Sequence, residues 1–268
     1  MVSKEDTPRA AFTLLPWRTT LIVIIALVPL SVLAWANTIE QSSSMKGMVM
    51  GLGQIGGRMP GSMSASLFLT MWVTMMTAMM LPTVAPMVLA HLAVARRRGD
   101  GVVSTIAFIG GYLLVWSAIG VVPLLAYWGF ATLDDGAAQS GWLPVLAGTI
   151  LVGAGAYQFT GWKQYCLNKC QSPFAFVAMH DFRRGTPGAL RAGVVHGAFC
   201  LGCCWALMTV LVVVGLMNPL WMAGLFALFF VEKHWKQGIV LARTAGSMLV
   251  ALGVAVIARP AMLELVSR

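Results

Sequence analysis

The chain has 268 residues, of which 59% are hydrophobic and 10% are charged, and its formal net charge is +9. About a quarter of the residues of soluble globular domains are charged, so this composition excludes that class and predicts an all-α, polytopic transmembrane helical bundle. The basic residues lie between apolar runs, where they act as topology signals and contact anionic lipid, and this pattern argues against a nucleic-acid-binding groove.

Apolar segments of about the length that crosses a bilayer recur along the chain. We expect spans at 19–36, 66–91, 103–128, 142–161, 192–215, 219–235 and 243–258. They form one transmembrane domain, 19–258, between a short first segment, 1–18, and a tail, 259–268. The bundle has about seven spans. It has six if the first is a cleaved signal peptide, as the small residues of LAWAN allow, or if the last two, which are short, do not fully cross.

The basic residues of the connecting segments are unevenly divided between the two sides of this bundle. Fourteen Lys and Arg residues, Lys163 and Lys233 among them, lie on the side of the N-terminus, and four lie on the other side. The positive-inside rule therefore predicts that the N-terminus is cytoplasmic. The same rule places the connection 37–65 outside and the connection 162–191 in the cytoplasm.

Methionine is concentrated in one part of the chain, since ten of the eighteen methionines lie between residues 45 and 80. Five lie in the outer connection (Met45, Met48, Met50, Met59 and Met63), and five follow in the second expected span (Met71, Met75, Met76, Met79 and Met80). Within that span they form two adjacent rows on a helix. Thioether sulfur binds Cu(I) without losing a proton, so these methionines are candidate copper ligands. The alternative is that they fill irregular helix interfaces.

The fifth expected span contains the motif HGAFCLGCCWALM, residues 196–208. On a helix His196, Cys200 and Cys203 project from one face, because they are four and three residues apart. Polar side chains inside a membrane are costly, and an imidazole beside thiols suits a soft metal ion. The sequence therefore predicts a metal site on this face. The alternative is that cysteine packs here as a small hydrophobic residue.

Three further cysteines are candidates to complete that site. Cys204 follows Cys203 directly, and Cys166 and Cys170 lie in the connection after the fourth expected span. A reducing cytoplasm and an odd cysteine count argue against a complete set of disulfides. Zn(II) also suits Cys and His ligands, but thioethers are poor ligands for zinc, so the methionines favour copper.

Glu232 and Lys233 end the sixth expected span. An acidic side chain at this depth needs a partner, so we expect Glu232 to pair with Lys233 or a nearby arginine. The alternative is that it acts as a hard metal ligand or as a proton acceptor.

Several motifs of this chain occur together in a known family. They are MWVTMMTAMMLP (71–82), YQFTGWKQYCLNKCQSP (157–173), HGAFCLGCCWALM (196–208), GLMNPLWM (215–222) and the Glu232–Lys233 pair. With them the chain resembles a bacterial domain-of-unknown-function family of predicted metal-binding integral membrane proteins. The resemblance covers roughly residues 65–235. It implies metal binding in a bacterial inner membrane and supplies no reaction.

The methionines and thiols together predict a copper-binding integral membrane protein. We expect it to capture Cu(I) at the outer methionines and to pass it to the inner Cys and His ligands. Two alternatives stay open: a structural or assembly subunit of a larger membrane complex, and a membrane thiol redox protein that uses Cys200 and Cys203 as a CxxC pair. The expected partners are the lipid bilayer, a copper carrier or an assembly factor for a cuproenzyme, and other subunits of a homo- or hetero-oligomer.

Overall fold

The structure is a computed structural model, and it describes residues 17–44, 64–100, 102–131, 142–179, 185–216 and 218–267. Every regular element in these ranges is an α-helix, which confirms the all-α prediction. The helices are α2 (Trp17–Ser44), α3 (Ala65–Arg97), α4 (Val102–Ile119), α5 (Val121–Ala131), α7 (Trp142–Tyr157), α8 (Gly161–Gln171), α9 (Pro173–Met179), α10 (Thr186–Val214), α11 (Pro219–His234), α12 (Gly238–Ala258) and α13 (Ala261–Ser267).

Local capping residues fix where the helices around the centre of the molecule begin. At the start of α8 the Thr160 hydroxyl accepts a hydrogen bond from the Lys163 backbone N–H at 3.2 Å. At the start of α11 the Asn218 side chain accepts from the backbone N–H groups of Leu220 and Trp221, at 3.1 and 3.3 Å. Both residues are preferred N-caps, because their side-chain oxygen satisfies backbone donors that the first turn leaves free.

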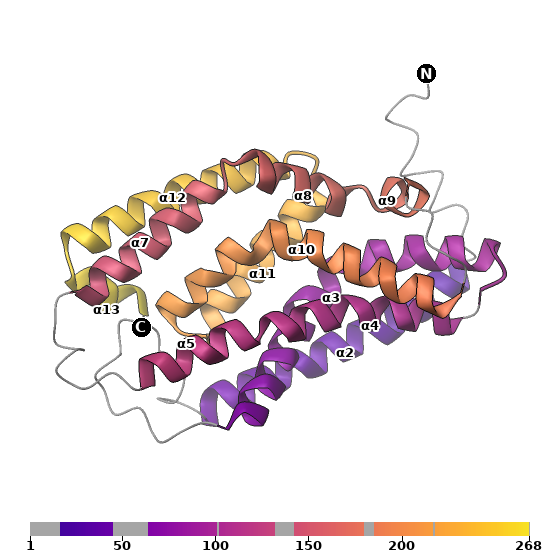
Figure 1. Ribbon diagram of the computed structural model, residues 1–268, viewed down its shortest axis with the longest axis horizontal. Helices are drawn as coiled ribbons and strands as arrows, with labels where there is room; N and C mark the ends of the chain where they lie inside the picture. The colour runs from indigo at the N-terminus through magenta and orange to yellow at the C-terminus, as the bar shows by residue number, and fades with distance from the viewer. Residues whose placement is uncertain are drawn as a thin grey trace.

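The helices lie in two groups with α10 and α11 between them. Figure 1 shows α7 and α12 side by side along one edge of the molecule, and α2, α3 and α4 along the opposite edge. α10 packs against α4, α7 and α8, and α11 contacts α3, α8, α10 and α12. The residues of α10 and α11 therefore face side chains from both groups.

A glycine brings α4 and α10 unusually close. A Cβ atom at Gly193 would collide with the backbone carbonyl of Phe108, which cannot move aside. This close approach of two backbones is typical of helices packed in a membrane. It places the next turns of the two helices, with Tyr112 and Cys200, in direct contact.

Four helices among the described residues are long and apolar enough to cross a membrane: Ala65–Arg97, Val102–Gly129, Thr186–Val214 and Gly238–Ala258. A fifth candidate is α7 with α8, two helices bent by 62° at a short break. The first expected span, 19–36, lies within α2. The sixth, 219–235, corresponds to α11, which has only 16 residues. The structure thus supports about four spans, and the predicted count of about seven is not confirmed.

The two connections that carry the predicted ligands differ from simple loops. The cytoplasmic connection expected at 162–191 contains most of α8, all of α9 and the start of α10. The outer connection expected at 37–65 is helical to Ser44, because α2 continues past the predicted end of the span. The five methionines between residues 45 and 63 lie outside the described residues.

Candidate metal centre

Three cysteines from two helices converge at the centre of the molecule. Cys200 and Cys203 lie on α10 and Cys170 lies on α8, and their Sγ atoms all lie within 4.8 Å of one another. The Sγ atoms of Cys170 and Cys203 are 3.8 Å apart. Cys200 and Cys203 are each 1% exposed, whereas Cys170 is half-buried. All the described cysteines are free thiols.

The spacing of these sulfur atoms suits one soft metal ion. A metal–sulfur bond is about 2.3 Å long, so three sulfurs around a trigonal ion lie about 4 Å apart and two around a linear ion about 4.6 Å apart. Cu(I) accepts soft thiolate ligands. The observed separations therefore fit two- or three-coordinate copper with little movement of the helices.

A buried lysine holds α8 in the position that this arrangement needs. Lys163 Nζ donates to Glu232 Oε2 of α11 at 2.8 Å and to the backbone carbonyl of Cys203 at 2.6 Å. At the other end of α8, Gln171 Nε2 donates to the Glu232 carbonyl at 2.6 Å. Because α8 is tied at both ends, Cys170 stays over the thiols of α10.

The position of Lys163 corrects the sequence interpretation. It was expected in a cytoplasmic connection as a topology signal, whereas its side chain is 0% exposed and bonded to Glu232. The pairing of Glu232 also differs from the expectation, because the acid pairs with Lys163 rather than with Lys233. Neighbouring residues on a helix point in different directions, so Glu232 and Lys233 face different partners.

Lys233 lies against the sulfur atoms instead. Its Nζ atom is 3.1 Å from Cys200 Sγ and donates to Thr83 Oγ1 at 3.0 Å. Its third neighbour is Met80 Sδ, at 3.9 Å. The Tyr112 hydroxyl oxygen is also 3.1 Å from Cys200 Sγ. Cys200 thus contacts both an ammonium group and a hydroxyl group.

The other predicted ligands on α10 and α8 lie beside the three-sulfur group. His196 is buried among the rings of Phe108, Tyr112 and Phe176, and its Nδ1 atom has no hydrogen-bond partner in the described part of the chain. Cys204 Sγ is 3.3 Å from Cys203 Sγ but outside the group.

Cys166 has a different environment from that of Cys170, although both belong to α8. Cys166 is buried against α10 at Gly202, where a Cβ atom would lie 2.7 Å from Cys166 Sγ. It is not a member of the three-sulfur group. The glycine leaves room for this sulfur, so the position of Cys166 is explained by packing.

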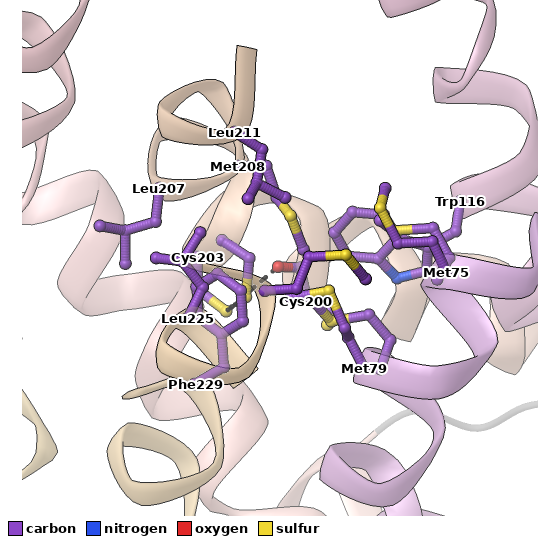
Figure 2. Close-up of a cluster of buried hydrophobic side chains, with 14 of the residues drawn as sticks. Met75, Met79, Trp116, Cys200, Cys203, Leu207, Met208, Leu211, Leu225 and Phe229 are labelled. Carbon is purple, nitrogen blue, oxygen red and sulfur yellow. Dashed lines mark hydrogen bonds between the residues drawn. The ribbon is translucent and has the colours of Figure 1, made fainter. Parts of the chain in front are cut away.

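The methionines of the second expected span all point into the core. The five at 71, 75, 76, 79 and 80 lie on α3 and are at most 3% exposed. Figure 2 shows Met75 and Met79 beside Cys200, on the side away from Cys203, and Met208 on the same helix as the thiols. Thioether and thiol sulfurs therefore share one buried region.

Three residues of this centre were not among the predicted site residues: Lys163, Tyr112 and Thr83. Lys163 is three residues before Cys166, and a lysine in the middle of the quoted motif YQFTGWKQYCLNKCQSP was the available signal. Tyr112 and Thr83 lie in expected spans among many other residues, and nothing in their local sequence distinguishes them.

Comparison with known proteins adds one match. Residues 69–256 match the model of a family described as PpoB2, copper chaperone. No curated protein and no solved structure matches the chain. The matched range contains the α3 methionines from Met71 onward, all five cysteines and both buried lysines. Since it spans more than half of the sequence, this chain belongs to the PpoB2 copper chaperone family.

Proposed function

We propose that this protein is a multi-pass membrane copper chaperone that holds one Cu(I) ion at Cys170, Cys200 and Cys203. The observation that carries the proposal is the convergence of three thiols from two helices within 4.8 Å. Cu(I) is a soft ion that thiolates bind well, and membership of a copper chaperone family makes it the cargo to test first.

The buried methionines of α3 supply the approach to this site. Met80 Sδ lies 3.9 Å from Lys233 Nζ, which itself lies 3.1 Å from Cys200 Sγ. Thiolates bind Cu(I) more tightly than thioethers do, so an ion exchanged along the methionines ends at the cysteines. His196, one turn before Cys200, is not needed in this three-sulfur shell and is available as a transient ligand.

The expected membrane topology completes the proposal. With about seven spans and a cytoplasmic N-terminus, copper captured outside moves inward to the thiols, and the recipient is a copper carrier or an assembly factor for a cuproenzyme. Single cysteines at Ser43 and Arg184, in a chain that lacks the native cysteines, are expected to react with an impermeant thiol reagent from opposite sides. Reaction of both from the same side contradicts this direction of transfer.

Anaerobic titration of the detergent-purified protein with Cu(I) tests the binding site. We expect one equivalent to bind with a thiolate-to-copper absorption band, and the triple variant Cys170→Ser, Cys200→Ser, Cys203→Ser to lose both. Elemental analysis of the protein as purified distinguishes copper from zinc.

Cys166→Ser provides the matched control, because Cys166 is buried on the same helix as Cys170 but outside the three-sulfur group. It is expected to retain one equivalent of copper. If the triple variant is folded and still binds one equivalent of Cu(I), or if Cys166→Ser abolishes binding, the proposed site is wrong.

A further inference from the structure

The buried charges around the thiols do not balance. The described part of the chain buries two lysines here, Lys163 and Lys233, and one acid, Glu232. The carboxylate of Glu232 accepts from Lys163 at 2.8 Å. The partners of Lys233 are a hydroxyl, a thioether and the Cys200 sulfur. The cluster therefore carries one excess positive charge, located at Lys233.

A buried ammonium group without a counter-charge is strongly unfavourable, so a side chain in this position needs an anion. The sulfur of Cys200, 3.1 Å from Nζ, is the group placed to provide it. The neutral partners of Lys233 satisfy its hydrogen-bonding capacity but not its charge. A negatively charged sulfur centre therefore accounts for the position of Lys233.

The charge of a loaded centre depends on the ion. When two of the three cysteines bind as thiolates and the third stays a neutral thiol, the Cu(I) centre carries one negative charge, which Lys233 cancels. A divalent ion such as Zn(II) on the same two thiolates is neutral and leaves the charge of Lys233 uncompensated. The Zn(II) complex and Lys233 together become neutral only if a third thiol loses its proton, which is costly in this buried site.

We propose that Lys233 is the residue that sets the metal preference of this centre, by supplying the counter-charge of a bis-thiolate complex with a monovalent soft cation. This inference rests on the proposed copper site and adds the basis of its selectivity. Two unit charges about 5 Å apart in a protein interior interact strongly enough to change an affinity by about 100-fold. The effect is therefore large enough to measure.

The test compares the affinities for Cu(I) and for Zn(II), each added alone and measured by competition with chromophoric chelators without oxygen. Lys233→Met removes the charge and keeps most of the side-chain volume, and Lys233→Gln is a second neutral variant with a polar end. In both we expect the ratio of Cu(I) to Zn(II) affinity to fall by about 10- to 100-fold. Ag(I), a second monovalent soft ion, is expected to follow Cu(I). Lys233→Arg keeps the charge and is expected to retain the wild-type preference for Cu(I) over Zn(II).

Lys169→Met is the matched control. It removes one positive charge from α8, but the Lys169 ammonium group lies over the Tyr165 ring, 5.5 Å from its centroid, so its affinity ratio is expected to equal that of the wild type. Thermal unfolding in the same detergent verifies that every variant is folded. A simple packing role for Lys233 would weaken both ions alike and leave the ratio unchanged.

Failure of this inference is distinct from failure of the proposed function. If the wild-type protein binds no Cu(I), the proposed function is wrong. If the wild type binds Cu(I) and the two neutral variants keep the wild-type affinity ratio, only the role of Lys233 is overturned. An equal shift in Lys169→Met also overturns it, because that ammonium group lies over the Tyr165 ring and not against the thiols.

Discussion

The α7–α12 pair and the centre formed by α3, α8, α10 and α11 solve the same packing problem in different ways. In the pair, a Cβ atom at Gly155 would lie 2.6 Å from the Gly246 carbonyl, and one at Gly148 would lie 2.6 Å from the Gly253 carbonyl. Every residue that these two helices bury is apolar or glycine. In the centre, two lysines, one glutamate, thiols and thioethers are buried together.

This difference distinguishes residues that pack helices together from residues that have a chemical role. Small residues let helices approach closely at no electrostatic cost, as α7 and α12 demonstrate. Buried ionisable groups are expensive in an apolar interior and tend to have a functional reason. The sulfur and charge in the centre therefore do more than hold helices together, and the predictions below separate the two regions experimentally.

The largest effect is expected from Glu232→Gln, which removes the one acid buried in the described part of the chain and leaves Lys163 and Lys233 without an opposite charge. We expect a loss of about 3–5 kcal/mol in the free energy of unfolding, measured by denaturant titration in detergent. Adding Lys163→Met to this variant is expected to recover most of the loss. If Glu232→Gln alone is as stable as the wild type, the Lys163–Glu232 ion pair does not hold α8 in place.

Gly155→Ala tests the packing region. The added Cβ meets backbone atoms of α12, which cannot rotate away, so the expected cost is about 1–3 kcal/mol of stability. Gly153 on the same helix has nothing within 4 Å of a Cβ atom, and Gly153→Ala is expected to be neutral or stabilising. Both variants, once folded, are expected to bind Cu(I) as the wild type does. Loss of copper from folded Gly155→Ala would contradict the separation of the two regions.

Replacing Met75, Met76, Met79 and Met80 with leucine tests whether these residues of α3 are copper ligands or only fill space. Leucine nearly preserves volume and hydrophobicity, so the expected cost is about 1.5 kcal/mol or less per site. We expect the rate of copper loading to drop while expression and thermal stability are retained. Unchanged copper uptake in the folded quadruple variant would mean that these methionines only fill space.

The sequence could predict the helical class and the shared face of Cys200 and Cys203, because apolar length and i, i+3 spacing are local properties. It could not select Cys170 over Cys166, since that depends on how α8 turns by 62° from α7 and lies on α10. Lys163 was interpreted only as a topology signal for a similar reason: its partner, Glu232, is 69 residues away. The different directions of Glu232 and Lys233, in contrast, follow from helix geometry and were available from the sequence.

The smallest effect is expected from Tyr112→Phe, which removes one hydroxyl from the centre and nothing else. That oxygen lies 3.1 Å from Cys200 Sγ, and the side chain is fully buried between α4 and α10. We expect a stability change of about 1 kcal/mol or less and a several-fold loss of Cu(I) affinity, because an O–H donor to a metal-bound thiolate stabilises its negative charge.

Tyr127→Phe is the matched control for this change, since Tyr127 is also buried but its ring lies against Phe68, 6.0 Å between centroids, on α3. It is expected to leave Cu(I) affinity unchanged. If Tyr112→Phe and Tyr127→Phe have equal affinities for Cu(I), the Tyr112 hydroxyl does not contribute to copper binding. Lys233 would then be the polar side chain that acts on the Cys200 sulfur. If Tyr112→Phe loses more Cu(I) affinity than either neutral Lys233 variant does, the Tyr112 hydroxyl contributes more to binding than the Lys233 ammonium group. The hydroxyl would then be the main partner of the metal-bound Cys200 sulfur.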